Sequence, residues 1–542
     1  MGYTPTAAPG SYHYLVEFSL DSTTLRYADE DLSLQSSNSS GRFYQGKLIQ
    51  SGKLNRALGS FLQPVETIQT FDVLIDNLDQ EIASHTQNYT FANRPVSIWL
   101  GSGDSKANYS KVFSGVVVHP AGISWNEDSA RITVADARMR HRRFLPPNTF
   151  NKTTYPNVAS NVVNYAIPIV YGDWRETVGS GEMVPAYCIS VTGLRFKVAD
   201  HRLVSINRLT KNAVSLNITT DTKNLCLTTA TFELDGIAYD ATSDVMAVNC
   251  RGVGNLTSPF ESPGDVSADI YKRWLNLTAT DLNVTSFASL AADLGTVHLR
   301  RHIGDQDSSE TILAELYSEA GVDMRYISGK YDPKARSLDP ASQRLDVRDS
   351  DVMLQQGKEL GDFSVEHDPE RYYANRVTAF YNYNPLDLLW GNATILNVTT
   401  AQRNVSAIVE RRMEMKWFYR TDEAENRASL ESVLYSSEPV AITALCGHRL
   451  LTQDLGDQID LTYSLYDSRA MQIRSIETDF SDMTTRVTAF DLFMNEGRWM
   501  PDSAPDYSAA TATQRRDSGF WSDDSGYVDP PQPASLEISL WF

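Results

Sequence analysis

The first 150 residues alternate apolar and polar side chains with a period of two, and this pattern restricts that part of the chain to a β fold. The runs are short, and clusters of turn-forming residues separate them. Several short strands in succession are typical of a barrel or a sandwich. We therefore expect residues 1–150 to form a barrel-like β domain. Its predicted strands are residues 12–20, 70–77, 94–101, 112–118 and 130–136.

Residues 151–285 have a different texture, because glycine and small polar residues are frequent and the apolar runs are shorter. The clearest of these runs are residues 196–198, 213–218 and 231–234. Enrichment in Thr, Val and Tyr favours strands over helices. We expect a separate, β-rich inserted domain, and the residues assign no role to it.

Residues 286–496 bring helices first and strands afterwards, which is the order expected of an α+β domain. We predict helices over residues 285–294, 308–320, 350–360 and 422–430. Ser308 or Ser309 can cap the start of the second helix, and Gly295 and Gly321 are plausible left-handed ends of the first two. The strands that follow are predicted over residues 375–383, 458–465, 471–476 and 486–492, with a turn at Gly456 and Asp457.

The C-terminal residues 497–542 are predicted to form an extended arm. Ser, Asp, Pro and Gly dominate up to residue 535, and few aliphatic side chains are present to build a core. The last residues are strongly apolar, and an exposed patch of this kind promotes aggregation. We expect the arm to dock on a neighbouring subunit or domain as an added strand; the alternative is that it folds back on its own domain. The docking candidates are Leu536, Ile538, Leu540, Trp541 and Phe542.

The bulk composition is that of a globular protein, with 42% hydrophobic and 21% charged residues. A net charge of −20 argues against specific nucleic-acid binding, which needs a basic face. No stretch is long and apolar enough for a membrane span, and no signal peptide is recognisable. Buried free thiols are expected for the sparse cysteines, with a disulfide among Cys188, Cys226 and Cys250 as the alternative.

We find no grouping of residues that predicts catalysis, a metal or a cofactor. The densest cluster of acids and histidine spans Glu366 to Glu370, but its spacing does not suit a metal, and Pro369 interrupts any helix. Asp362 and Glu366 could be read as a glycosidase pair, but a sequence with 68 acidic residues contains such pairs by chance. The sequence also lacks the motifs of serine hydrolases, phosphate-binding loops and dinucleotide-binding folds.

One basic run stands out after the first predicted domain: Arg138, Arg140, His141, Arg142 and Arg143. No aromatic stacking residues are interspersed with these side chains, so a nucleic-acid site is not indicated. The four arginines are candidates for contacting an acidic partner subunit. The alternative is a solvated strand end that nearby carboxylates neutralise.

Three features, taken in order, resemble the tail-tip or baseplate hub proteins of long-tailed bacteriophages. The first is the barrel-like segment with residues 71–77 and 112–116, which leads into Asp136-Ala137-Arg138. The second is the stretch Ile167-Pro168-Ile169-Val170-Tyr171-Gly172. The third is the C-terminal half, with residues 375–377, 418–421, 455–457 and 487–492. Together they span most of residues 10–495.

The resemblance implies a fold that is mainly β with α+β portions. It comprises two barrel-like domains of the tail-tube type (residues 1–150 and 286–496), a β-rich inserted domain (151–285) and the extended arm (497–542). It also implies a homotrimer in which three subunits form a pseudo-sixfold ring and catalyse nothing. Its partners would be a distal tail or tube protein above, a tip or fibre protein below, and possible contact with a tape-measure protein. DNA would pass through the channel unbound.

Such a protein is a structural component at the distal end of the virion tail and is made in the host cytoplasm. A receptor-binding or fibre-like tail protein is the alternative, but it predicts repeated fibrous segments, and no repeat is visible. A secreted or cell-wall enzyme would need a catalytic pair and a secretion route, and the sequence indicates neither.

Overall fold

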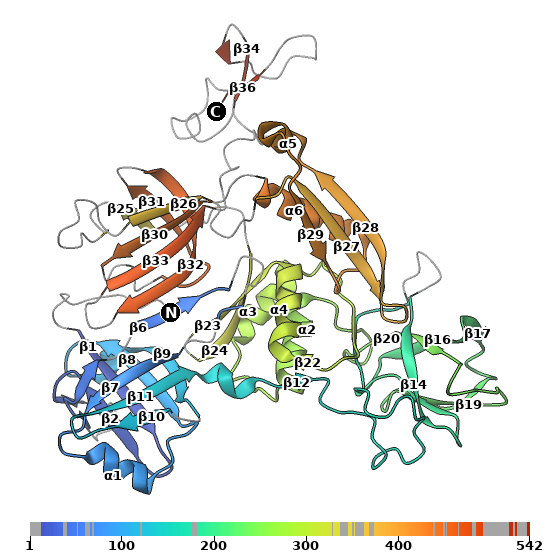
Figure 1. The fold of residues 1–542 in the computed structure, drawn as a ribbon, viewed down its shortest axis with the longest axis horizontal. Helices are drawn as coiled ribbons and strands as arrows, with labels where there is room; N and C mark the ends of the chain where they lie inside the picture. The colour runs from blue at the N-terminus through green and yellow to red at the C-terminus, as the bar shows by residue number, and fades with distance from the viewer. Residues whose placement is uncertain are drawn as a thin grey trace.

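Most of the chain is arranged as β-sheets around a small group of central helices (Figure 1). The computed structural model describes residues 12–35, 41–50, 53–59, 65–67, 70–119, 122–175, 182–327, 329–336, 345–348, 352, 363–367, 373–436, 440–447, 450, 453–463, 466–479, 484–491, 520–523, 526–527 and 539–541. The predicted helix over residues 350–360 lies outside these residues except for Val352.

The N-terminal sheet has eight strands and a barrel-like form, and it is drawn in blue in Figure 1. Its strand order is β2-β1-β8-β9-β11-β7-β5, with β10 paired to β11. Alternate side chains point into one apolar core, as the period of two predicts, and helix α1 (Glu81–Asn88) contributes Ile82 to this core. The strands are β1 His13–Ser19, β2 Thr24–Ala28, β5 Leu48–Gln50, β7 Thr70–Asp76, β8 Pro95–Gly101, β9 Tyr109–Val117, β10 Ile123–Trp125 and β11 Ser129–Asp136.

A second apolar cluster lies where the hairpin of β3 (Leu32–Leu34) and β4 (Arg42–Tyr44) packs against β1 and β9. Tyr44 and Leu34 are fully buried there against Leu15. Both faces of this part of the sheet are therefore covered. The short 3-10 helix η2 (Lys106–Asn108) connects β8 to β9.

The insertion forms its own seven-stranded sheet with the order β17-β16-β20-β14-β15-β19-β18. Its core is separate from the others and includes the two buried thiols Cys188 and Cys250. All four cysteines of the chain are free, so the predicted free thiols are present. The strands are β14 Val184–Ser190, β15 Arg195–Lys197, β16 Ser205–Lys211, β17 Val214–Leu216, β18 Thr222–Cys226, β19 Thr231–Leu234 and β20 Met246–Arg251.

The central helices share the largest apolar core with the hairpin of β23 and β24. As predicted, Ser308 caps α4 by accepting a hydrogen bond from the Thr311 amide, and Gly321 ends it with a φ of 69°. The predicted left-handed end at Gly295 is wrong, because α3 already ends at Leu294, which has a φ of −108°. The elements are α2 Pro263–Asp269, the π-helix η4 Ile270–Trp274, α3 Val284–Asp293, α4 Ser309–Ala320, β23 Val322–Ile327 and β24 Lys330–Ala335.

Two short ladders connect the central helices to the preceding segments. β12 (Phe144–Leu145) pairs with β22 (Asp307–Ser308), and β13 (Ile169–Tyr171) pairs with β21 (Arg301–Ile303). These ladders hold the segment after the N-terminal sheet against the start of α4. They also hold the start of the insertion against the central core.

A three-stranded sheet with the order β28-β27-β29 lies above the central helices in Figure 1. Helix α6 packs against β27 and β28, and the predicted alternation places Val377, Ala379 and Tyr381 in the common core. The predicted helix over residues 422–430 is confirmed and is longer than expected. The elements are β27 Arg376–Asn384, β28 Leu389–Asn397, α5 Thr399–Val405, β29 Glu410–Glu414 and α6 Thr421–Tyr435.

The C-terminal sheet is the second barrel-like sheet, and it lies next to the N-terminal one in Figure 1. Its order is β25-β31-β32-β33-β30-β26, and a seventh strand, β6, pairs with β32. The Gly456 turn before β31 has the predicted positive φ, and Asp457 accepts a hydrogen bond from the Asp454 amide. The strands are β6 Lys53–Ala57, β25 Leu345–Arg348, β26 Phe363–His367, β30 Val440–Cys446, β31 Gln458–Tyr463, β32 Tyr466–Asp479 and β33 Thr484–Asp491.

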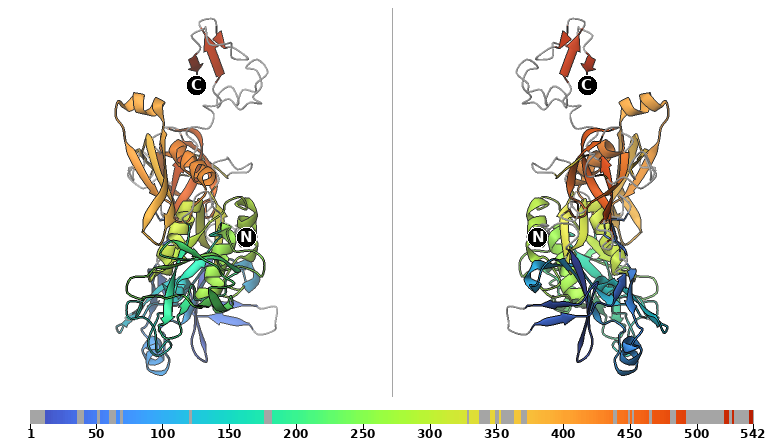
Figure 2. Two further views of the ribbon diagram at one scale, coloured as in Figure 1. Left: turned by 90° about the vertical axis from the view of Figure 1, so that its right-hand side faces the viewer. Right: turned by 90° about the vertical axis from the view of Figure 1, so that its left-hand side faces the viewer.

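Three short strands of the predicted arm form a separate sheet with the order β35-β34-β36, drawn in red at the top of Figures 1 and 2. They are β34 Phe520–Asp523, β35 Gly526–Tyr527 and β36 Ser539–Trp541. The predicted fold class, mainly β with α+β portions and two barrel-like sheets, is confirmed. The domain boundaries remain a prediction.

Candidate functional site

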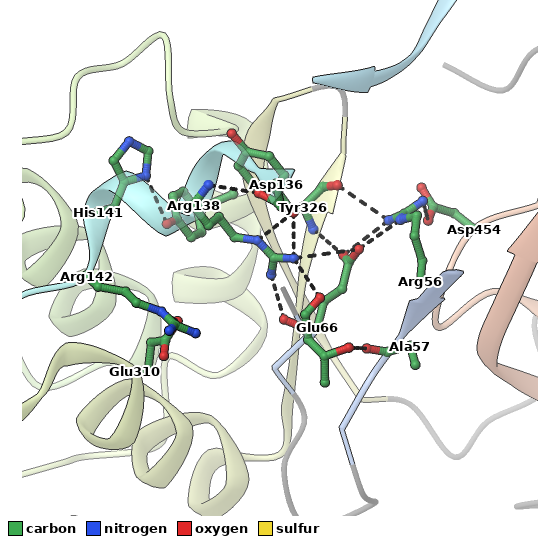
Figure 3. Close-up of polar contacts among 12 residues, drawn as sticks. Arg56, Ala57, Glu66, Asp136, Arg138, His141, Arg142, Glu310, Tyr326 and Asp454 are labelled. Carbon is green, nitrogen blue, oxygen red and sulfur yellow. Dashed lines mark hydrogen bonds and ion pairs between the residues drawn. The ribbon is translucent and has the colours of Figure 1, made fainter. Parts of the chain in front are cut away.

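The basic run begins at the centre of the molecule, in the 3-10 helix η3 (Ala137–His141) that follows β11. Asp136 caps this helix by accepting a hydrogen bond from the Arg138 amide at 2.8 Å. The turn directs the Arg138 side chain inward, where only 4% of it is exposed (Figure 3). Arg138 is therefore not a surface residue of this chain, although the sequence places it in an interface candidate.

Every part of the Arg138 guanidinium has a partner. Nε and Nη2 donate to Asp136 Oδ2 at 2.9 and 2.7 Å, Nη1 donates to the Glu66 carbonyl at 2.7 Å, and Nη2 donates to the Thr67 carbonyl at 3.1 Å. The Tyr326 ring centroid lies 5.0 Å from the guanidinium carbon. A buried charge needs this degree of pairing, since an uncompensated one would cost several kcal/mol.

Glu66 links Arg138 and its partners to the C-terminal sheet. Its carboxylate accepts hydrogen bonds from Arg56 at 2.8 and 3.2 Å and from the Tyr326 amide at 2.7 Å. Arg56 lies on β6 and also pairs with Asp454 at 2.7 Å. Burial alone would raise the pKa of Glu66, but Arg56 and Arg138 hold it below its ordinary value. The cluster Arg56–Glu66–Arg138–Asp136–Asp454, which we call the junction cluster, thus connects both barrel-like sheets to β23.

A second buried ion pair fastens the β23–β24 hairpin to the C-terminal sheet. Asp323 is 1% exposed and accepts from Arg336 at 3.1 Å and from Arg474 of β32 at 3.2 Å. These two cations outweigh burial and lower the pKa of Asp323. On the same hairpin, Arg325 pairs with Asp332 and donates to the carbonyl of Leu455 at 3.1 Å.

The strand β6 completes the connection through main-chain pairing. Residues 53–57 run antiparallel to residues 475–479, with Asn55 opposite Glu477 and Arg56 opposite Ile476. The preceding strand, β5, belongs to the N-terminal sheet. One continuous stretch of chain therefore contributes a strand to each of the two sheets. No sequence pattern predicted the pairing of β6 with β32.

The stretch Ile167–Trp174 has a packing role. The Val170 amide donates to Nε2 of His201 at 2.9 Å, and burial lowers the pKa of His201 to about 4. The Tyr171 hydroxyl donates to Asp269 at 2.9 Å. The stretch Ile167–Trp174 therefore fixes the insertion against η4 and the central helices.

A further buried cation, Arg300, joins the insertion to the three-stranded sheet. It is 2% exposed and lies between the rings of Trp174 and Tyr419, whose centroids are 4.7 and 4.3 Å from its guanidinium carbon. The guanidinium also donates to Glu182 at 2.5 Å and to Asn382. This arrangement leaves the cation enclosed and paired, so it acts as a structural contact.

A cavity of about 760 Å³ lies beside the junction cluster, between η3 and the exposed side of α4. Glu319 lines it and is only 7% exposed. Both oxygens of its carboxyl accept backbone hydrogen bonds, from Lys416 at 2.9 Å and from Trp417 at 2.8 Å. Burial nevertheless raises the pKa of Glu319 to about 8, with Glu315 adding to the rise.

The described residues contain no group of three His, Cys, Asp or Glu side chains that could hold a metal ion. Glu366 and His367 lie on the exposed strand β26 rather than in the turn that their sequence suggests, and residues 362 and 368–370 lie outside the described part. Within the described residues, no helix has both the length and the apolar character needed to cross a membrane.

The other predicted interface residues have varied environments. Arg140, Arg142 and Arg143 are all exposed, and Arg142 forms an ion pair with Glu310 at 2.8 Å. Leu540 and Trp541 belong to β36 and lie opposite Trp521 and Phe520 of β34 in the same chain. Leu536, Ile538 and Phe542 lie outside the described residues. The interface roles of all these residues remain predictions.

Sequence reasoning missed Arg56, Glu66, Asp454, Asp323 and Arg300. Arg56 and Glu66 are 10 residues apart and Asp323 and Arg336 are 13 apart, which is still beyond a local sequence pattern, and the other partners lie more than 70 residues away. The triplet Asp136-Ala137-Arg138 was the one available signal, since an aspartate before a short turn caps it and can face an arginine two residues later.

The solved structures most similar to this chain in fold come from phage tails and related particles. The 43 kDa tail protein of prophage MuSo2 from Shewanella oneidensis has a TM-score of 0.40 at 10% identity, with 89% of this chain and 99% of that chain covered. A tail protein from Neisseria meningitidis MC58 has a TM-score of 0.40 at 8% identity, covering 91% and 99%. A chain from the virion of a native gene transfer agent has a TM-score of 0.38 at 11% identity, covering 60% and 84%.

No family model and no curated protein sequence matches the chain. The structural neighbours agree with the resemblance stated from the sequence, at low identity.

Proposed function

We propose that this chain is a structural virion component, the hub of a phage tail tip or baseplate that joins the tail tube to the distal tip. The observation that carries the proposal is the rigid connection between its two barrel-like sheets. The strand β6 leaves one sheet to pair with the other, and the junction cluster locks the two through buried ion pairs. Two sheets held at a fixed angle are suited to form consecutive segments of a ring.

Three such subunits would close a ring with six sheets around a channel, as the resemblance implies. Cyclic closure also covers sheet edges, which otherwise promote aggregation. The negative charge of the chain suits a passage through which DNA moves without binding. A distal tail or tube protein would lie above the ring, and a tip or fibre protein below it. Opening or closing of the tail channel would follow from movement at these two contacts.

The proposal assigns no catalytic role to any residue. The buried charged groups of the junction cluster and around Asp323 and Arg300 are paired with one another, which supports a scaffold rather than a reactive site. We therefore expect the purified protein to leave peptidoglycan, glycans and peptides intact. Zymography would contradict this if it showed clearing that a single Asp or Glu substitution abolishes.

Oligomeric state and position in the particle test the proposal together. We expect light scattering to give the mass of a trimer, and class averages of the purified protein to show threefold rings. Antibody labelling of particles should place about three copies at the tail end. A stable monomer within assembled particles would contradict the proposal, and labelling along fibres would favour a receptor-binding protein instead.

A further inference from the structure

The segment Met139–Phe144 exposes both apolar and basic side chains on the surface next to the junction cluster. Met139 is 36% exposed and Phe144 is 68% exposed, so two large apolar side chains lie at the surface within one short segment. Arg140, Arg142 and Arg143 between them are exposed as well. We call Met139, Arg140, Arg142, Arg143 and Phe144 the rim patch.

The rim patch is held in place at both ends. Arg138 anchors the start through its buried hydrogen bonds, and Leu145, which is fully buried, anchors the end. Between them, the Ser309 amide donates to the Arg143 carbonyl at 2.8 Å, and Phe144 pairs with Ser308 in the β12–β22 ladder. A surface presented on a fixed backbone loses little conformational entropy when a partner binds it.

Two of the three exposed guanidinium groups are unsatisfied within the described part of the chain. Arg142 pairs with Glu310, but the side chains of Arg140 and Arg143 have neither an ion pair nor a hydrogen bond to another described residue. Burial and the nearby Arg94 lower the pKa of Arg140. Arginine, methionine and aromatic side chains are the residue types enriched at the centres of protein interfaces.

The rim patch borders the cavity of about 760 Å³, which Arg142 and His141 also line. The cavity gives a partner side chain a recess next to Arg142. The surface thus combines an apolar anchor, unpaired cations and a hollow, whereas the chain as a whole carries a net charge of −20.

We propose that the rim patch is the surface that contacts an acidic face of a second copy of this chain. This inference rests on the ring proposed above. In a closed ring of three, each contact joins two different surfaces, so a basic patch on one copy meets another surface on the next. Copies with a net charge of −20 repel each other, and a fixed patch of unpaired arginines offsets that repulsion where it meets acidic residues.

The test compares two double charge reversals in the full chain. Arg140→Glu/Arg143→Glu inverts the rim patch, and Lys152→Glu/Arg202→Glu makes the same change in charge at two exposed residues of the insertion. Sedimentation velocity in 0.15 M salt should show trimers for the natural chain and for the control. For the rim variant we expect monomers, or an association at least 10-fold weaker. Circular dichroism should stay unchanged, because neither guanidinium makes an ion pair or a hydrogen bond with another described residue of its own subunit.

The milder variant Arg140→Gln/Arg143→Gln covers the case in which the reversal impairs folding, and it should also weaken the trimer. Phe144→Ser tests the apolar anchor separately and should also weaken the trimer. Trimers that persist in both arginine variants would overturn the inference while leaving the proposed ring intact. A natural chain that is monomeric at all concentrations would overturn the ring itself. A variant that still forms trimers but fails to join a neighbouring tail protein would assign the rim patch to that protein and reject the second copy.

Discussion

A guanidinium buried in a protein needs partners for its charge and for its N–H groups, and Arg138 obtains them from two separate segments. Asp136 supplies the charge, and the carbonyls of Glu66 and Thr67 take the remaining donors. Glu66 in turn neutralises Arg56. Removing one member leaves another buried charge uncompensated, which is more costly than the loss of the contact itself.

We expect Arg138→Met to lower the free energy of unfolding by about 3–5 kcal/mol, because Asp136 and Glu66 would lose a buried counter-charge. Denaturant titration measures this change. Arg202→Met is the matched control, since Arg202 is exposed and lies outside the rim patch, and it should change the same quantity by less than about 0.5 kcal/mol. Equal effects of the two substitutions would show that the junction cluster does not stabilise the fold.

Glu319 makes stability depend on pH in an unusual direction. Its pKa in the folded chain, about 8, lies above the ordinary value of about 4.3 in the unfolded chain. Between these values the folded state holds more protons, so stability falls as pH rises, by at most about 1.4 kcal/mol per pH unit, and the loss ends above pH 8. Glu319→Gln cannot ionise, and its stability relative to the natural chain should therefore increase from pH 5 to pH 8. A difference that stays constant across this range in denaturant titrations would contradict the assignment.

At the scale of single elements, the strand β6 determines how the two barrel-like sheets are related. It is an edge strand for β32, yet it belongs to the chain segment that follows β5 of the other sheet. The side chains of Asn55 and Glu477 face each other across this ladder. The main-chain hydrogen bond from Leu58 to Arg474 at 2.9 Å fixes the register.

Asn55→Cys/Glu477→Cys should form a disulfide within one subunit, because directly opposed residues of antiparallel strands have Cβ atoms about 4.5–5.5 Å apart. Non-reducing gels and peptide mass analysis detect this bond. Asn55→Cys/Asp479→Cys lies two residues out of register, where the separation is about 7–8 Å, and should cross-link poorly. Cross-linked dimers in place of an internal bond would show that β6 pairs with another copy.

The elements that sequence predicted best are those whose signals are local. Period-two alternation identified β1, β7, β8, β9 and β11, and a serine cap and a terminal glycine framed α4. Gly295 was misinterpreted because a glycine after a helix permits a positive φ without requiring it. The pairing of β6 with β32 and the partners of Arg138 depend on contacts between distant parts of the chain, which no local window contains. Four neighbouring arginines consequently looked equivalent in the sequence.

At the scale of the whole molecule, assembly is where the proposed function succeeds or fails. The two sheets are fixed to each other by paired charges, whereas Arg140 and Arg143 of the rim patch have no ion pair with a described residue. Rigid subunits with a few exposed contacts associate without a large cost in internal order. The C-terminal arm is the other candidate contact, and its β36 pairs within the chain.

Deleting residues 536–542 should weaken assembly of the ring or of the tail while leaving the subunit folded. The deletion removes β36 and an apolar terminus, whereas the described core clusters are built from residues between Tyr12 and Phe490. Sedimentation measures ring formation, and the unfolding temperature serves as the control for folding. Normal assembly of the shortened chain would show that the arm makes no essential contact between subunits.

The pairing of β6 with β32 also sets an order of events during synthesis. A ribosome releases residues 53–57 early, but their partner residues 475–479 emerge only about 420 residues later. The first 136 residues can form most of the N-terminal sheet, while β6 and Arg56 remain without their partners until β32 and Asp454 have been made. A chain that stops before residue 475 therefore cannot join its two sheets through β6, and the proposed ring would accept only subunits that have been translated past β32.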